Sequence, residues 1–264
     1  MNLRVAQRGW GRRYWLPLVH RRLVPLRDVG PVASFTFDDF PRTAYKTGGK
    51  ILEDNGVRGT FYAALGLVNS TNLSGEQFVL DDLHSVVANG HELASHTRRH
   101  VSSQTMSTSV FLQEVRDGRS ALQDISGLPI SRNFAYPYGS VTSGTKRAIA
   151  KEMLSCRGIY PGINGRMVDV SLLRANPLYG DTDQLDSLRH LIRATEDSAG
   201  WLIFYTHDVR RSPSKFGCTP TLLEATIKAV LESSIGILTV DEVLARTGRS
   251  IERSPVTRQS QINE

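Results

Sequence analysis

The sequence of 264 residues predicts an α/β fold in which a parallel sheet or barrel is built from alternating strands and helices. Short apolar runs rich in β-branched and aromatic residues alternate with longer segments of helical periodicity. Helix-stop pairs stand where these segments should end, at Asn55-Gly56, Asn89-Gly90 and Ser126-Gly127. Hydrophobic residues make up 40% and charged residues 22% of the chain, so a sizeable core is expected.

Apolar runs of strand length predict eight strands, over residues 32–37, 58–64, 91–95, 133–137, 153–158, 170–174, 201–206 and 236–240. The segments between them predict six helices, over residues 43–55, 75–89, 108–126, 143–152, 184–198 and 220–233. No internal repeat and no Pro/Gly linker divides this series. We therefore expect one domain over residues 32–246, preceded by a basic arm over residues 1–31 and followed by a polar tail over residues 247–264.

Residues 1–27 are basic and aromatic, with seven arginines and no acidic residue. Arginine pairs interrupt each apolar stretch, so the apolar core of a secretory signal is missing. The longest clean apolar run, residues 201–205, is too short to span a membrane. We expect a cytoplasmic protein whose arm either packs its aromatic residues on the domain or makes peripheral contact with the anionic inner membrane face.

The formal net charge of +6 is accounted for by the basic arm, and the rest of the chain is close to neutral. The sequence shows neither a basic stripe with stacking aromatics nor a known nucleic-acid-binding module, so we expect no nucleic-acid partner. Cys156 and Cys218 match no metal-binding or redox spacing and are expected to be reduced, buried thiols.

Asp38 and Asp39 directly follow the first predicted strand. Neighbouring residues that leave a strand point in different directions, so one carboxylate can bind a metal while the other transfers protons. An Asp-Asp pair before Phe40-Pro41 is also typical of a simple turn, and this alternative stays open on these residues alone.

His96 and His100 follow another predicted strand at a spacing of i and i+4. In a helical turn, both imidazoles would lie on one face, which suits two ligands of a single divalent cation. Two histidines and one carboxylate with an open position describe a catalytic site of the zinc type. An isolated pair at this spacing is also common without a metal.

Two further signals stand at strand ends. Residues 136–139, Tyr-Pro-Tyr-Gly, form an aromatic turn in which a backbone N–H can face a ligand, and His207 ends an apolar strand. Each alone is more typical of ordinary packing. All the signals, however, fall at the carboxyl ends of strands in one βα series, which is where barrel enzymes build their active sites.

In this order, the motifs resemble those of the NodB-homology polysaccharide deacetylases, carbohydrate esterase family four. The resemblance spans residues 32–242 and rests on Thr36-Phe37-Asp38-Asp39, His96-Thr97-Arg98-Arg99-His100, Phe134-Ala135-Tyr136-Pro137-Tyr138-Gly139 and His207. It implies a distorted (β/α) TIM-like barrel with seven or eight parallel strands. It also implies a metal-dependent N- or O-deacetylase that acts on a carbohydrate.

The resemblance implies a role for each matching residue. Asp38 matches the catalytic base and His207 the catalytic acid, while the backbone N–H of Tyr138 would hold the oxyanion. Pro137 and Tyr138 would contact the substrate. The implied metal ligands are Asp39, His96 and His100. Zinc is the expected metal, with cobalt, nickel or manganese as substitutes.

The sequence departs from the family pattern at two positions. Ala135 stands where the family commonly has an arginine that orients the base, and topology suggests Arg174 as the replacement. Tyr205 stands where the family prefers a leucine in the acetyl pocket, so we expect Tyr205 to contact the substrate. The aspartate that usually pairs with the catalytic histidine is not placed by the sequence; the candidates are Asp169, Asp181, Asp183 and Asp208.

The resemblance is closest to the cytoplasmic branch that serves exopolysaccharide or holdfast-type adhesin synthesis. The expected substrate is an N-acetylated polysaccharide or a lipid-linked oligosaccharide. One alternative is a ring-opening amidohydrolase that acts on a small ureide, and another is a catalytically inactive carbohydrate-binding protein. The Asp-His-His set disfavours the first, and the presence of Asp38 and His207 disfavours the second.

Overall fold

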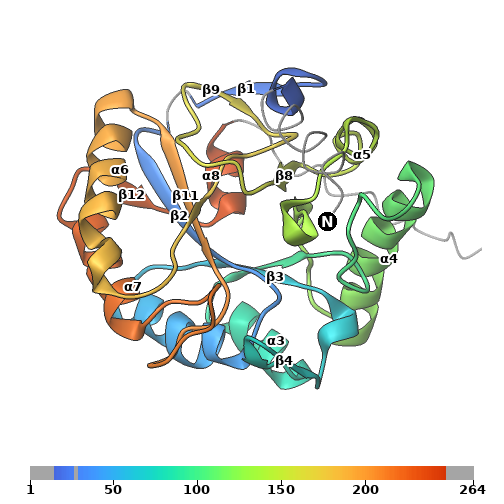
Figure 1. Cartoon of the computed structure of the whole chain (residues 1–264), viewed down its shortest axis with the longest axis horizontal. Helices are drawn as coiled ribbons and strands as arrows, with labels where there is room; N and C mark the ends of the chain where they lie inside the picture. The colour runs from blue at the N-terminus through green and yellow to red at the C-terminus, as the bar shows by residue number, and fades with distance from the viewer. Residues whose placement is uncertain (1–14, 27–28, 248–264) are drawn as a thin grey trace, which may run out of the picture.

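The computed structural model of the chain describes residues 15–26 and 29–247. Within them, an eight-stranded parallel sheet curls into a distorted barrel with helices around its outer side (Figure 1), which confirms the predicted fold class. The strand order is β10–β11–β2–β3–β6–β7–β8, and β12 pairs with β2. The strands are β2 (Val32–Phe37), β3 (Thr60–Ala63), β6 (Glu92–Ser95), β7 (Asn133–Ala135), β8 (Ser155–Arg157), β10 (Asn176–Pro177), β11 (Trp201–Thr206) and β12 (Gly236–Ile237).

The two ends of the sheet, β8 and β10, approach each other through residues 170–177. Leu173 forms a parallel bridge with Arg157, and β10 follows it. The strand predicted over residues 170–174 is therefore wrong, except for this single bridge. The physical reason is a turn at Asp169, whose carboxylate accepts a hydrogen bond from the backbone N–H of Ser171 at 3.1 Å.

The helices connect successive strands, except for α8, which follows the last strand. They are α2 (Lys50–Asp54), α3 (Leu80–Ala88), α4 (Thr108–Ser126), α5 (Ser143–Ile149), α6 (Leu185–Ser198), α7 (Pro220–Leu231) and α8 (Val240–Arg246), with a π-helix η2 (Ala44–Gly49) before α2. Short 3₁₀ turns occur at η1 (Leu16–Leu18), η3 (Leu65–Leu67), η4 (Pro137–Gly139) and η5 (Thr182–Gln184). Gly127, with a φ of 65°, ends α4 at the predicted residue.

Helix α8 was missed, because residues 236–240 were predicted as one strand. Strand β12 covers only the first two of them. Thr239 then begins a capping box: its hydroxyl accepts from the backbone N–H of Glu242 at 3.2 Å, and the Glu242 carboxylate accepts from the backbone N–H of Thr239 at 2.7 Å.

The described part of the N-terminal arm packs on the domain. Strand β1 (Leu23–Pro25) pairs antiparallel with β9 (Met167–Asp169), and we call this pair the β1–β9 ribbon. The buried Lys146 fixes η1 and the ribbon together, because its Nζ donates to the carbonyl oxygen of Leu16 and to Oδ2 of Asp169. A second small pair, β4 (Thr71–Asn72) and β5 (Gly75–Glu76), delays the start of α3 to Leu80.

The largest apolar cluster lies between the sheet and its outer helices, and it includes the stacked rings of Phe37 and Phe61, 4.7 Å apart. This packing fixes the strand ends on which the polar residues stand. Among the described helices, none is long and apolar enough to cross a membrane.

Candidate active site

Three side chains able to bind one metal ion meet at the carboxyl edge of the sheet. Asp39 follows β2, whereas His96 and His100 lie in the segment after β6. The Oδ1 atom of Asp39 lies 2.9 Å from Nε2 of His100 and 3.5 Å from Nε2 of His96. One ligand atom from each residue lies within 4.8 Å of the others. The structure thus brings the predicted Asp-His-His set together.

The two histidines reach Asp39 through an irregular loop, so the helical turn expected at residues 96–100 is wrong. Thr97 and His100 have φ values of 66° and 54°, a left-handed region that non-glycine residues rarely adopt. Helix α4 packs closely on this loop: a Cβ atom at Gly118 would lie 2.5 Å from the carbonyl carbon of Thr97. The surrounding backbone therefore holds the loop in its unusual conformation.

His96 is oriented and kept neutral by its surroundings. Its Nδ1 lies 2.8 Å from the carbonyl oxygen of Ala135, which only accepts, so Nδ1 carries the proton and donates it. Nε2 is then left without a proton and faces Asp39. Burial lowers the pKa of His96 to about 4, so the imidazole is neutral at neutral pH, as metal binding requires.

The Asp39 carboxylate keeps hydrogen-bonding capacity that no described residue fully uses. Its buried Oδ1 faces the Nε2 atoms of both imidazoles, and within the described ranges it forms no hydrogen bond of good geometry. Burial alone would raise the pKa of Asp39, but the close imidazole of His100 and the nearby His96 lower it well below its ordinary value. A buried carboxylate with an unsatisfied oxygen and two imidazoles are a donor set that fits a divalent transition metal.

Asp38 is buried next to this set and contacts Arg157. The Nη2 atom of Arg157 donates to Oδ1 of Asp38, and the Arg157 side chain is fully buried. Burial alone would lower the pKa of Arg157, but the Asp38 carboxylate raises it, so the guanidinium stays charged. Arg157 ends β8 directly opposite Ala135 in β7. The arginine missing at position 135 is therefore matched by one on the neighbouring strand.

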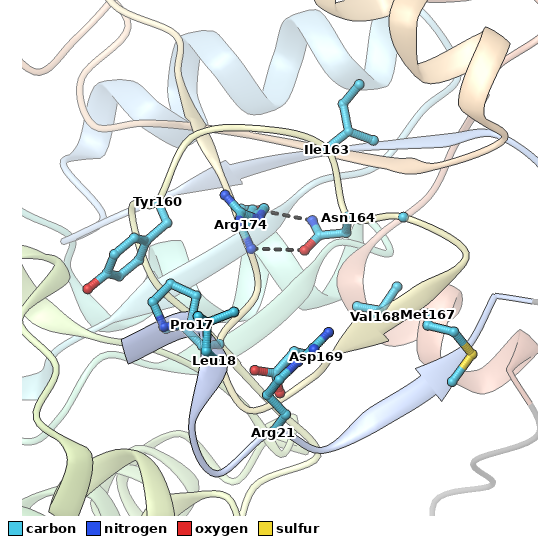
Figure 2. Close-up of a pocket in the computed structure, with 12 residues that line it drawn as sticks. Pro17, Leu18, Arg21, Tyr160, Ile163, Asn164, Met167, Val168, Asp169 and Arg174 are labelled. Carbon is cyan, nitrogen blue, oxygen red and sulfur yellow. Dashed lines mark hydrogen bonds between the residues drawn. The ribbon is translucent and has the colours of Figure 1, made fainter. Parts of the chain in front are cut away.

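Arg174, which topology suggested for this role, lies elsewhere. Its side chain is exposed, and Nη1 donates a hydrogen bond to the carbonyl oxygen of Pro161 at 2.9 Å. Its backbone N–H donates a hydrogen bond to Oδ1 of Asn164 (Figure 2). The expectation for Arg174 is wrong because the Leu173 side chain is buried in the apolar cluster with Ile203 and Tyr205, and the next side chain along an extended backbone points the opposite way.

Two tyrosines stack on the Arg157 guanidinium. Its central carbon lies 5.2 Å from the ring centroid of Tyr62 and 5.1 Å from that of Tyr205. Both distances are within the range of cation–π attraction. Tyr205 is only 7% exposed. Its position therefore differs from the one expected in an open acetyl pocket, because its ring packs against the residue that holds Asp38.

His207 follows β11 at the same edge of the sheet. Its Nδ1 lies 3.2 Å from the carbonyl oxygen of Phe216, and its ring centroid lies 5.4 Å from that of Phe216 and 6.3 Å from that of Tyr179. Nδ1 therefore donates to a backbone carbonyl. Each aspartate considered as a partner for His207 is engaged elsewhere: Asp169 with Lys146, Asp181 with Thr182 and Thr219, Asp183 with Gln184, and Asp208 with Ser214.

The turn after β7 places Tyr138 beside the metal-ligating set. Tyr138 has a φ of 59°, and its ring centroid lies 4.5 Å from that of His100. The side chain is 66% exposed. Within the described residues, no hydrogen bond takes up its backbone N–H. Pro137, which is buried, begins the turn and fixes its direction.

The sequence reasoning missed Arg157, Tyr179 and Phe216. The signal for Arg157 was present, because a charged residue ended the predicted apolar strand over residues 153–158. Tyr179 and Phe216 gave no local signal, since both lie in loops whose approach to His207 depends on the folded barrel.

Residues 27–154 match the model of the polysaccharide deacetylase family, the family that the motifs predicted. No curated protein sequence matches the chain.

Solved structures of related proteins share the fold. The chitin deacetylase of Colletotrichum lindemuthianum has 19% identity and a TM-score of 0.57, covering 84% of this chain and 90% of its own. A family 4 carbohydrate esterase domain of a xylanase from the hindgut metagenome of Trinervitermes trinervoides has 20% identity and a TM-score of 0.53, covering 83% and 92%. A mutant of a pseudoenzyme of the same family has 14% identity and a TM-score of 0.52, covering 81% and 67%.

Proposed function

We propose that the protein is a metal-dependent polysaccharide deacetylase that removes N-acetyl groups from N-acetylhexosamine units and releases acetate. The observation that carries this proposal is the meeting of Asp39, His96 and His100 next to a carboxylate held by a buried arginine. A metal-ligand set beside a separate, oriented base is the arrangement that amide hydrolysis needs.

Asp38 acts as the general base in this proposal. It accepts a proton from the water that attacks the acetyl carbonyl carbon, and Arg157 keeps the carboxylate in one orientation. When bound by Asp39, His96 and His100, the metal supplies a Lewis acid that polarises the carbonyl and makes water more acidic; zinc is expected, with cobalt, nickel or manganese as substitutes.

The remaining steps concern the oxyanion and the leaving group. The exposed turn at Tyr138 offers its backbone N–H to the developing oxyanion, and loss of one such donor typically costs about 3 kcal/mol. His207, in its protonated form, donates a proton to the leaving nitrogen, which departs as an amine as the carbon–nitrogen bond breaks. Pro137 and Tyr138 form the side of the site on which the sugar rests.

The cellular role follows from the sequence expectations. The substrate would be an N-acetylated polysaccharide or a lipid-linked oligosaccharide used in exopolysaccharide or adhesin synthesis. The protein would work in the cytoplasm, in peripheral contact with the inner membrane face through residues 1–27. Residues 32–246 would form the catalytic domain, with residues 1–31 as the arm and residues 247–264 as the tail.

A catalytically inactive carbohydrate-binding protein is the second candidate, because one structure with the same fold is a pseudoenzyme. The presence of both Asp38 and His207 at the edge that carries the metal-ligand set favours hydrolysis.

Acetate release tests the proposal. Purified protein loaded with zinc is incubated with N-acetylglucosamine oligomers and, separately, with a small ureide, while acetate and free amine are measured. We expect acetate and amine in equal amounts from the oligomers, and none after chelation. Oligomer binding without acetate would favour the inactive candidate, and ring opening of the ureide would favour the amidohydrolase alternative.

A further inference from the structure

Apolar side chains are exposed together on η1 and the β1–β9 ribbon. Leu18 is 69% exposed and Met167 is 51% exposed, and Trp15 and Leu23 are also exposed. In the ribbon, Val24 pairs with Val168 and both are buried. Because side chains alternate along strands, Leu23 and Met167 lie on the opposite, outer face as diagonal neighbours. This face therefore exposes apolar side chains, with Asp169, which pairs directly with Leu23, on the same side of the ribbon.

Exposed arginines surround these apolar side chains. Arg21, which precedes β1, and Arg174 line a hollow of about 130 Å³ between η1 and β9 (Figure 2), and Arg166 directly precedes β9. Within the described residues, none of the three forms an ion pair. Asp169, the acid that lines the hollow, is paired with the buried Lys146. The face therefore carries an excess of positive charge.

We propose that this face binds an anionic phospholipid bilayer. We call it the basic apolar face, and it comprises Trp15, Leu18, Arg21, Leu23, Arg166, Met167 and Arg174. Tryptophan and aliphatic side chains enter the boundary between headgroups and acyl chains, while arginines contact the phosphates. A second copy of the chain is a poorer occupant, because a two-fold contact would place the same arginines opposite one another.

The basic apolar face extends the membrane contact expected for residues 1–27. Met167, Arg166 and Arg174 belong to a distant part of the sequence, and the ribbon places them beside the arm. The face is therefore a folded surface with a defined orientation, in contrast to a contact made by a basic segment alone.

One loop separates this face from the candidate active site. Ile159 packs against Gly139, next to Tyr138, whereas Tyr160 and Ile163 line the hollow. If the proposed deacetylase activity holds, a lipid-linked oligosaccharide anchored in the bilayer would present its sugars beside the site. This link to the substrate rests on the proposed function, whereas the membrane contact itself does not.

Vesicle co-sedimentation of the full chain tests the proposal. The probes are vesicles that contain phosphatidylglycerol and vesicles of phosphatidylcholine alone, at low and high salt. We expect binding to the anionic vesicles, weakened by salt. The double variant Arg21→Gln/Arg166→Gln should reduce partitioning about 25-fold at low salt, which is about fivefold for each arginine. Leu18→Ser/Met167→Ser should weaken binding while leaving its salt dependence in place.

The matched control is Arg189→Gln/Arg193→Gln, which removes the same charge from exposed arginines of α6. Equal loss in both arginine variants, or equal binding to neutral vesicles, would overturn the proposal. Circular dichroism and thermal unfolding verify that each variant is folded. Acetate release from soluble oligomers is measured in parallel. If the deacetylase proposal is wrong, no variant releases acetate. If the membrane proposal is wrong, all variants sediment with vesicles to the same extent.

Discussion

Replacing Arg157 tests whether the Asp38 carboxylate must be held in one orientation to act as the general base. Arg157→Ala leaves the Asp38 carboxylate buried and removes the cation that contacts it. The Arg157 side chain is fully buried, so its removal opens a polar cavity beside this carboxylate. The direct contact that is lost is the one to the base, because Arg157 forms no hydrogen bond or ion pair with the predicted metal ligands among the described residues.

The expected magnitude follows from these contacts. Removing one partner of a buried ion pair costs about 3–5 kcal/mol of folding free energy. Loss of the stacking on Tyr62 and Tyr205 adds to this, at about 0.5–2 kcal/mol for each ring. Because a positioned general base contributes about 10²–10⁴-fold to the rate, we expect kcat to fall about 100-fold or more. KM should change little, because Arg157 is not exposed to substrate.

Acetate release gives kcat and KM, urea unfolding gives the stability, and elemental analysis gives the metal content. Arg157→Lys keeps the charge but loses the planar fork and the stacking, so its kcat should lie between those of the wild type and Arg157→Ala. The exchange Ala135→Arg/Arg157→Ala returns the guanidinium to the neighbouring strand and should restore part of kcat, since the two positions are directly paired.

An unchanged kcat in Arg157→Lys and Arg157→Ala, with both proteins folded and loaded with metal, would refute this reasoning. Loss of metal in parallel with activity would also refute it, because Arg157 would then act through the metal ligands and not through Asp38.

Three further predictions concern metal binding and stability. His96→Ala and His100→Ala should lose metal, whereas Asp38→Asn should retain it and lose nearly all turnover; equal metal loss in all three by elemental analysis would make Asp38 a ligand. Gly118→Ala should weaken metal binding, because the added Cβ would press on the loop between the two histidines. Overpacking of this kind costs about 1–3 kcal/mol. An unaltered zinc affinity, measured by competition with a chelating dye, would contradict this prediction. Lys146→Ala should lower the free energy of unfolding in urea by about 3–5 kcal/mol, because it leaves a partly buried carboxylate without its cation, and a loss below 1 kcal/mol would show the pair to be dispensable.

The elements that were predicted best are those whose signals are local. The bounds of β2, β11 and α4 match the predicted ranges, because apolar runs of strand length or a helical pattern between a cap and a glycine define them without reference to other parts of the chain. The apolar run at residues 170–174 was misassigned because the Asp169 side chain captures a backbone N–H of the following residues. Helix α8 was missed although its capping box, Thr239 to Glu242, stands in the sequence.

The residues of the candidate site also differ in whether a local sequence signal predicted them. Asp39, His96 and His207 were identified because parallel strands place their carboxyl ends at one edge, so sequence position after a strand indicates spatial proximity. Arg157 was not identified, because its relation to Asp38 depends on which strand lies next to β7 and on the direction of its side chain in the barrel. Both depend on pairing between distant segments, which a single sequence does not encode locally.

The stacking of Tyr205 on Arg157 makes three positions of this chain interdependent in evolution. A leucine at position 205 would remove one of the two rings that hold the guanidinium, and an arginine at position 135 would stand directly opposite position 157 on the neighbouring strand. The effects of exchanges at Ala135, Arg157 and Tyr205 should therefore be non-additive, because all three positions bear on the one guanidinium beside Asp38. A comparison of single positions would misread each of the three as a loss, although together they preserve the charge beside Asp38.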